Sequence, residues 1–296
     1  MADRAVREPT AESRQADRFR VPAIVWAIPP LLALAGGFLY PLVLMARRAF
    51  TNELGGGFDL GRFGSILATP YYLRSLLTTL EISVSATAGC LVLGFILSLI
   101  LAFVPFPGSN LLGRMVDVVL AFPSFLIAFS LIFLYGSSGS VNQLLERLFG
   151  LRTAPLEFLY APVGAIFAEI LFYTPFVMRP LLASFAQLDS AHLEVASSLG
   201  ARWWRIVALV ILPQTIPSLL AGGSLCLMLT FNEFGIMLFL SAKSLTTLPV
   251  LVYSYAMLQL DLPSAAVVAI TNVLLSLALY FLYRGLLTRF DSAPVV

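Results

Sequence analysis

Charged side chains are scarce in this sequence. They make up 11% of the 296 residues, whereas hydrophobic residues make up 59%, and the mean hydropathy is +0.92. A water-soluble globule needs more polar surface than this composition can supply. The sequence therefore predicts an integral membrane protein, with lipid instead of water around much of the chain.

Basic clusters, histidine and cysteine are also rare. The formal net charge is +2, and no run of lysine and arginine could follow a phosphate backbone, which argues against nucleic-acid binding. Histidine, cysteine and aspartate form no cluster at metal-ligand spacing, so no metal, cofactor or catalytic site is expected. The two cysteines, Cys90 and Cys226, lie within apolar runs, where a thiol behaves as a small hydrophobic group and a disulfide framework is not expected.

Long apolar runs dominate the rest of the chain. A helix needs about 20 apolar residues to cross a hydrocarbon core of about 30 Å. Six runs are long enough, at approximately residues 21–45, 76–104, 115–135, 159–186, 214–240 and 263–283. The predicted fold class is therefore an all-α membrane protein with six transmembrane helices. We expect a cytoplasmic tail at residues 1–20 and one six-helix transmembrane domain at residues 21–290.

The distribution of positive charge gives an orientation. Six spans place both termini on the same side, together with the loop at residues 105–114 and the stretch at residues 188–213. That side carries ten lysines and arginines, against seven on the other side, which favours cytoplasmic termini by the positive-inside rule. Arg47 and Arg48, directly after the first apolar run, oppose this assignment.

Two short helices are predicted outside the apolar runs. In the loop after the third run, Ser140 and Gln143 fit a capping box that opens an amphipathic helix, and Gly150 closes it. In the polar stretch after the fourth run, Asp189 predicts an N-cap and Gly200 a left-handed end, with two to three helical turns between them.

Trp203 and Trp204 follow this second short helix. They stand between Arg202 and Arg205, and tryptophan and arginine are both well accommodated where lipid meets water. The sequence therefore predicts a separate interfacial helix here, before a span that starts near Pro213.

The polar stretch also fits a longer pattern, E-A-A, three residues, G, nine residues, I-x-L-P. The matching positions are Glu194, Val195, Ala196, Gly200, Val210, Leu212 and Pro213, with Val195 in place of the first alanine and Val210 in place of isoleucine. This pattern resembles the motif of permease subunits of binding-protein-dependent ABC importers of the type I fold. The alternative is an ordinary connecting loop with a satisfied cap, which does not account for the distant Leu-Pro pair.

The resemblance implies how transport is powered. In that family the motif forms a cytoplasmic coupling helix that contacts the ATP-hydrolysing subunit, so it assigns ATPase coupling to Glu194, Val195, Ala196, Gly200, Leu212 and Pro213. Glu194 near the helix N-terminus is favourable against the helix dipole. The chain has no G-x-x-x-x-G-K-[ST] phosphate loop and is not itself the ATPase.

The same resemblance implies partners and a location. They are two ATP-binding subunits, a second permease subunit that is identical or homologous, an extracytoplasmic solute-binding protein and the lipid of a bacterial inner membrane. A narrower likeness, at residues 231–235 and 246–249, is to the branch that handles polyamines, iron and aminophosphonates. The implied cargo is a small polar solute, such as one that bears an amine.

Polar groups within the apolar runs suggest a path for that solute. Ionisable groups in a span are costly and usually face a cavity or a partner, and Glu233, Asn232, Glu169 and Tyr173 are the candidate path residues. The alternative is that each acid has its own partner. Glu169 would then bind Tyr173 one turn on, and Glu233 would be capped by neighbours or face a second permease.

Two other classes of membrane protein fit the sequence less well. An ion-coupled secondary transporter often has inverted halves, but no repeat is visible, and the coupling motif would have no role. An intramembrane serine protease would use the Ser140 region, but the only histidine, His192, is expected on the opposite side of the membrane.

Overall fold

The computed structural model describes residues 23–51, 57, 60–240 and 245–291. The regular elements in these ranges are all helical, and six helical segments are long and apolar enough to cross a membrane. The prediction of an all-α membrane protein with six transmembrane helices is therefore confirmed. The predicted tail at residues 1–20 lies outside the described ranges.

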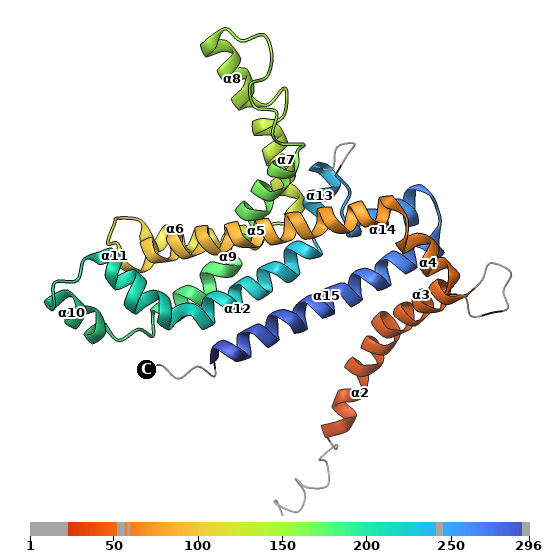
Figure 1. Ribbon diagram of the computed structural model, residues 1–296, viewed down its shortest axis with the longest axis horizontal. Coiled ribbons are helices and arrows are strands. Elements are labelled where there is room, and N and C mark those ends of the chain that lie inside the picture. Colours follow the sequence, from red (N-terminus) through yellow and green to blue (C-terminus); the bar gives the residue numbers. More distant parts are fainter. Residues whose placement is uncertain (1–22, 52–56, 58–59, 241–244, 292–296) are drawn as a thin grey trace, which may run out of the picture. The chain divides into compact units, whose positions relative to one another are not determined.

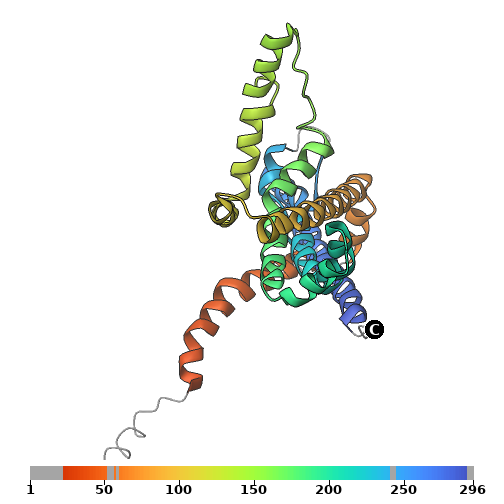
Figure 2. The same cartoon turned by 90° about the vertical axis from the view of Figure 1, so that its left-hand side faces the viewer.

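The chain forms two compact units, Met1–Asp59 and Leu60–Val296. The described elements of the first unit are α2 (Ala23–Leu34), the π-helical turn η1 (Ala35–Leu39) and α3 (Tyr40–Phe50). Figures 1 and 2 show them as one curved helix. Arg47 and Arg48 lie in the last turn of α3, so they belong to the helix end rather than to a following loop.

The second unit contains the other helices. They are α4 (Gly61–Leu67), α5 (Pro70–Phe103), α6 (Ser109–Val119), α7 (Ser124–Tyr135), α8 (Ser140–Phe149), α9 (Pro162–Phe185), α10 (Ser190–Ser198), α11 (Trp203–Ile206), η2 (Val207–Ile211), α12 (Leu212–Phe231), α13 (Gly235–Leu240), α14 (Leu248–Tyr253), η3 (Ser254–Leu258) and α15 (Leu262–Asp291). The second, fourth and sixth predicted spans correspond to α5, α9 and α15.

The core of this unit lies where α5, α9 and α12 pack together, with α15 against α12 (Figure 1). Glycine permits the close approach of the helices. A Cβ atom on Gly222 would lie 3.0 Å from the Cα atom of Val177 and 3.1 Å from Cγ of Pro180, and one on Gly94 would lie 3.0 Å from Cγ1 of Val177. Without a hydrophobic drive between helices in lipid, such tight packing supplies much of the association energy.

The third predicted span, at residues 115–135, is wrong at its start. Met115 belongs to α6, the chain turns over residues 120–123, and α7 begins after Pro123. Proline has no backbone N–H and disfavours helical backbone in the residue before it, so it suits a helix start. The turn is itself largely apolar, which is why hydropathy did not reveal it.

The fifth predicted span, at residues 214–240, is wrong at both ends. The helix runs from Trp203 through η2 into α12 and ends at Phe231. The two tryptophans therefore form the first turn of the span and not a separate helix. After a non-helical segment, α13 begins at Gly235, and the backbone N–H of Ile236 donates to Oε1 of Glu233 at 2.7 Å, which caps the new helix.

The predicted capping box of α8 is also wrong. Gly139 occupies the N-cap, Ser140 is already in the first turn, and Nε2 of Gln143 donates to the carbonyl of Ser138 at 2.9 Å. The predicted closing glycine is confirmed, since Gly150 has φ +63°.

Asn142, in the first turn of α8, organises the loop between α7 and α9. It is fully buried, and its Nδ2 donates to the carbonyls of Tyr135, Gly136 and Leu156 at 3.2, 2.9 and 3.0 Å. Its Oδ1 accepts from the backbone N–H of Leu156 at 2.9 Å. One amide thus fixes the end of α7 to the segment that leads into α9.

Candidate functional site

Helix α10 begins at a satisfied cap. Asp189 has extended backbone, and its Oδ1 accepts a hydrogen bond from the backbone N–H of Ala191 at 2.9 Å. A carboxylate here satisfies a free N–H group at the helix start and interacts favourably with the helix dipole. The predicted N-cap is therefore confirmed.

The other end of α10 closes in a Schellman motif at Gly200, whose φ is +78°. The N–H of Gly200 donates to the carbonyl of Ser197 at 2.9 Å, and the N–H of Ala201 donates to the carbonyl of Ala196 at 3.1 Å, which is the bonding pattern of this motif. The left-handed conformation costs a residue with a Cβ atom about 1–2 kcal/mol. Because both ends are closed, α10 is a short and rigid unit.

One face of α10 is anchored in the protein. Leu193 and Ala196 pack against the core cluster that includes Phe185 at the end of α9. The ring of Phe103, at the end of α5, lies 5.3 Å from the ring of Phe185 and 5.6 Å from that of Trp203. The ends of α5 and α9 therefore meet the start of the fifth span beside α10. A displacement of α10 would push on these three membrane helices.

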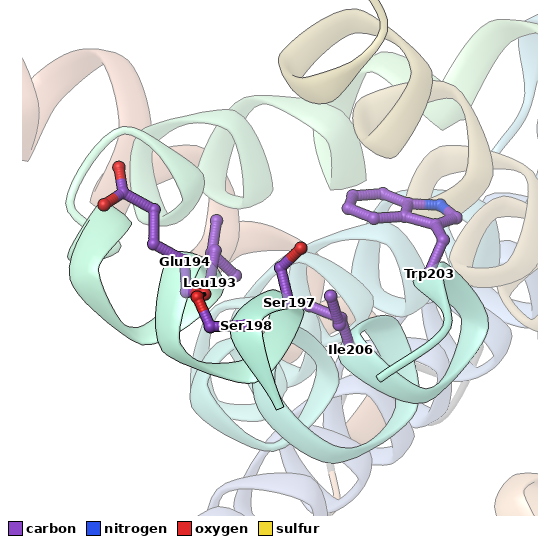
Figure 3. A pocket seen from close by; sticks show the side chains of 6 residues that line it. All are labelled: Leu193, Glu194, Ser197, Ser198, Trp203 and Ile206. Atoms are coloured by element: carbon purple, nitrogen blue, oxygen red, sulfur yellow. Dashed lines mark hydrogen bonds between the residues drawn. The ribbon is translucent and has the colours of Figure 1, made fainter. Parts of the chain in front are cut away.

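The other face of α10 is open. Val195 is 59% exposed and Leu199 is 82% exposed. A separate side of α10 carries an open groove of about 510 Å³, lined by Leu193, Glu194, Ser197, Ser198, Trp203 and Ile206 (Figure 3). Figure 3 shows Glu194 at one end and Trp203 at the other. An apolar floor with a carboxylate and two hydroxyls suits a protruding protein side chain with both apolar and polar parts.

The last two motif residues begin α12, directly after the π-helical turn η2. Pro213 is exposed and Leu212 is partly buried. The motif thus extends from the short helix α10, through the connection at residues 199–202, into the fifth membrane span.

A second polar cluster surrounds Glu233, directly beyond the far end of α12, a helix of 20 residues that is about 30 Å long at 1.5 Å per residue. Glu233 is 6% exposed. Its Oε1 accepts from Oγ of Ser124 at 2.9 Å and from the N–H of Ile236 at 2.7 Å, and its Oε2 accepts from the hydroxyl of Tyr173. One carboxylate thereby joins the start of α7, the middle of α9 and the start of α13.

The other candidate path residues have different surroundings. Glu169 is fully buried, and neither of its carboxylate oxygens has a hydrogen-bond partner, so the hydrogen bond considered between Glu169 and Tyr173 is not formed. Asn232 is exposed, and its Oδ1 accepts from Nδ2 of Asn272 at 2.9 Å and from Oγ of Ser276 at 3.2 Å. Asn232 thus links the end of α12 to α15.

Comparison with known proteins identifies the family. Residues 94–292 match the family described as "Binding-protein-dependent transport system inner membrane component". The chain belongs to this family. The prediction of an ABC importer permease, made from the motif at Glu194, is therefore confirmed.

Two relatives show the range of this permease family. The "Putative 2-aminoethylphosphonate transport system permease protein PhnU" of Salmonella typhimurium (strain LT2) is 48% identical over 261 residues, which cover 88% of this chain and 91% of that protein. The "Sulfate transport system permease protein CysT" of Escherichia coli (strain K12) is 26% identical over 260 residues, which cover 87% of this chain and 91% of that protein.

A solved structure shares the permease fold. It is titled "Crystal structure of bacterial alginate ABC transporter in complex with alginate pentasaccharide-bound periplasmic protein". Its matching chain superposes with a TM-score of 0.77 at 19% identity, over 92% of this chain and 96% of that chain. At this identity the match supports the fold alone, and the predicted type I importer fold is confirmed.

The predicted site residues thus fall into separate groups in this permease. Glu194, Val195 and Ala196 lie on α10 and Gly200 lies directly after its C-cap, whereas Glu233 and Tyr173 are hydrogen-bonded to each other far along the bundle. Sequence reasoning missed Ser124 as a partner of Glu233, because the two are separated by 109 positions. It also missed that Val195 and Leu199 form an exposed apolar pair, although their spacing of four residues at a capped helix was visible.

Proposed function

We propose that this permease imports 2-aminoethylphosphonate, or a closely similar small aminophosphonate, as the membrane subunit of an ATP-driven importer. The observation that carries the choice of solute is the 48% identity over 88% of the chain to the relative PhnU. The fold does not decide the solute, because a relative named for sulfate transport is 26% identical over a similar length.

The power source in this proposal is ATP, hydrolysed by two partner subunits, one of which docks on α10 of this chain. Three features support this role. The helix is closed at both ends by Asp189 and Gly200. One face is anchored to the ends of α5 and α9, whereas Val195 and Leu199 are exposed and the side of the helix at Glu194 carries an open groove. In this arrangement α10 and both chain termini face the cytoplasm.

Two further partners complete the importer in this proposal. A second permease subunit, identical or homologous, would pair with this one, and an extracytoplasmic binding protein would deliver the solute on the opposite side. The structural neighbour titled with a periplasmic protein in its complex supports a partner of this kind.

The solute path is proposed to pass the cluster of Glu233, Asn232, Glu169 and Tyr173. The support is chemical, since carboxylates favour the ammonium group of an aminophosphonate. The measurement is uptake by Glu233→Gln. Unchanged transport kinetics with normal ATPase coupling would remove Glu233 from the path and leave it as the cap of α13.

The solute assignment is tested by uptake in cells without an aminophosphonate transporter of their own. Cells that express this chain with its partner subunits should accumulate labelled 2-aminoethylphosphonate, and excess unlabelled sulfate should not compete. If sulfate competes and 2-aminoethylphosphonate is not taken up, the solute is wrong and the family assignment stands.

A further inference from the structure

Glu169 is buried in the core where α9 meets α5 and α12. Its exposed fraction is 0%, and neither carboxylate oxygen has a hydrogen-bond partner. An ionised carboxylate in such a place has lost its hydration and gained nothing in return, which costs far more than the burial of a neutral polar group. Tyr173, one turn later on α9, does not relieve this cost because its hydroxyl donates to Glu233.

The groups that face Glu169 are acidic or neutral. They are Tyr173 on α9 itself, Cys90 on α5, Cys226 on α12 and Glu233 in the segment after α12. The Sγ atom of Cys90 lies 4.0 Å from the backbone carbonyl oxygen of Glu169. Of the other helices packed on α9, α13 has no ionisable side chain, and Arg114 of α6 and Tyr135 of α7 make no hydrogen bond with Glu169. Neither carboxylate oxygen of Glu169 accepts a hydrogen bond from a cationic side chain among the described residues.

The geometry restricts what Glu169 can bind. While the helices are packed, the fully enclosed side chain leaves no room for a solute-sized group, whereas a proton needs no space and removes the charge. We propose that Glu169 is a proton-binding site of the closed core. As α5, α9 and α12 close around it, the carboxylate takes a proton from a hydronium ion, which becomes a water molecule. When the helices pack, it remains a neutral carboxylic acid.

This site links helix packing to pH, whichever solute is carried. A carboxyl group in water loses its proton above about pH 4.3, so separation of α9 from α5 and α12 at neutral pH releases the proton that the closed core holds. A process that releases one proton becomes more favourable as the pH rises, by up to about tenfold per pH unit. The closed core is therefore expected to weaken toward alkaline pH.

Infrared spectroscopy of the full chain with its partner subunits in lipid nanodiscs tests the proposal. The carbonyl stretch of a protonated carboxyl group is distinct from that of a carboxylate and shifts in heavy water. The wild-type protein should show this band at about pH 7, and Glu169→Gln should lose it. The matched control is Glu81→Gln, because Glu81 is an exposed acid on α5, and this variant should keep the band.

Equal bands in the wild type and in Glu169→Gln would overturn the proposal. If Glu169→Gln does not assemble, Glu169→Met takes its place, because it removes the unpaired oxygens and keeps a side chain of similar length. If Glu169 is neutral and unpaired, its replacement removes no favourable interaction. Glu169→Met should then assemble, lose the band and melt at or above the wild-type temperature. A clearly lower melting temperature would mean that a partner holds an ionised Glu169, and the proposal would be wrong.

Discussion

Tyr173 of α9 donates its hydroxyl hydrogen to the carboxylate of Glu233, 60 positions later. The same carboxylate accepts from Ser124 and from the N–H of Ile236. Glu233 stands in the break between α12 and α13, so this contact holds the interrupted fifth span against α9 and the start of α7. The break between α12 and α13 is thus a joint held by specific hydrogen bonds, and not a frayed helix end.

The contact between Tyr173 and Glu233 should couple the two residues in a double-mutant cycle. We expect Tyr173→Phe to lower the free energy of unfolding by about 1.5–3 kcal/mol, the usual range for a hydrogen bond to a charged group. In the background of Glu233→Gln the same change should cost much less, and thermal unfolding in detergent measures both. The control is Tyr72→Phe, a buried tyrosine outside this cluster. Additive losses would show that the contact does not stabilise the joint.

Gly200 should tolerate only residues that accept its backbone conformation. With φ at +78°, Gly200→Ala is expected to strain the end of α10 by about 1–2 kcal/mol, whereas Gly200→Asn should be milder because asparagine adopts left-handed backbone more readily. Uptake at equal membrane abundance compares the two variants. Equal uptake by both would show that the left-handed end of α10 is not required for transport.

Gly222 should be sensitive to side-chain size because α9 lies directly against it. A Cβ atom there would lie 3.0 Å from the Cα atom of Val177, and backbone cannot move aside as a side chain can. We expect Gly222→Val to cost about 1–3 kcal/mol through overpacking, seen as a lower melting temperature. The matched control is Gly113→Val, since nothing lies within 4 Å of that position. An equal effect of the two changes would contradict the close contact.

Asn142→Ala should release the loop between α7 and α9. The change leaves the partly buried N–H of Leu156 without its acceptor. A fully buried donor without an acceptor costs about 1–3 kcal/mol, so the loss here should lie toward the lower end of that range. Limited proteolysis within residues 150–158 should become faster in this variant. Gln143→Ala removes a hydrogen bond in an exposed setting and should leave the cleavage rate near that of the wild type. If cleavage is unchanged in Asn142→Ala, other contacts fix the loop.

Local features of the fold were predictable from the sequence, and distant ones were not. The left-handed conformation of Gly200 follows from neighbours within a few positions, and so does the N-cap at Asp189. The break after Phe231 depends on Ser124 and Tyr173, which lie far away in the chain. Hydropathy predicts one continuous span across that break. It also predicts a continuous span across the turn at residues 120–123.

The candidate site shows the same division. The E-A-A pattern found the residues of α10 because their spacing is short and regular, and the family match agrees with it. The partners of Glu233 come from α7, α9 and α13, and the isolation of Glu169 arises from packing among α5, α9 and α12, which no local pattern encodes. Their role in the solute path therefore stays a prediction.

The central claim is that ATP drives uptake through α10, and one measurement addresses it directly. The chain is reconstituted in proteoliposomes with its partner subunits and binding protein, and solute uptake is followed with and without ATP while ionophores collapse the ion gradients. We predict ATP-dependent uptake by the wild type that ionophores do not reduce, and none by Glu194→Lys or Gly200→Asp, although both variants insert in the membrane. Uptake that needs an ion gradient, or that persists in these variants, would contradict the account.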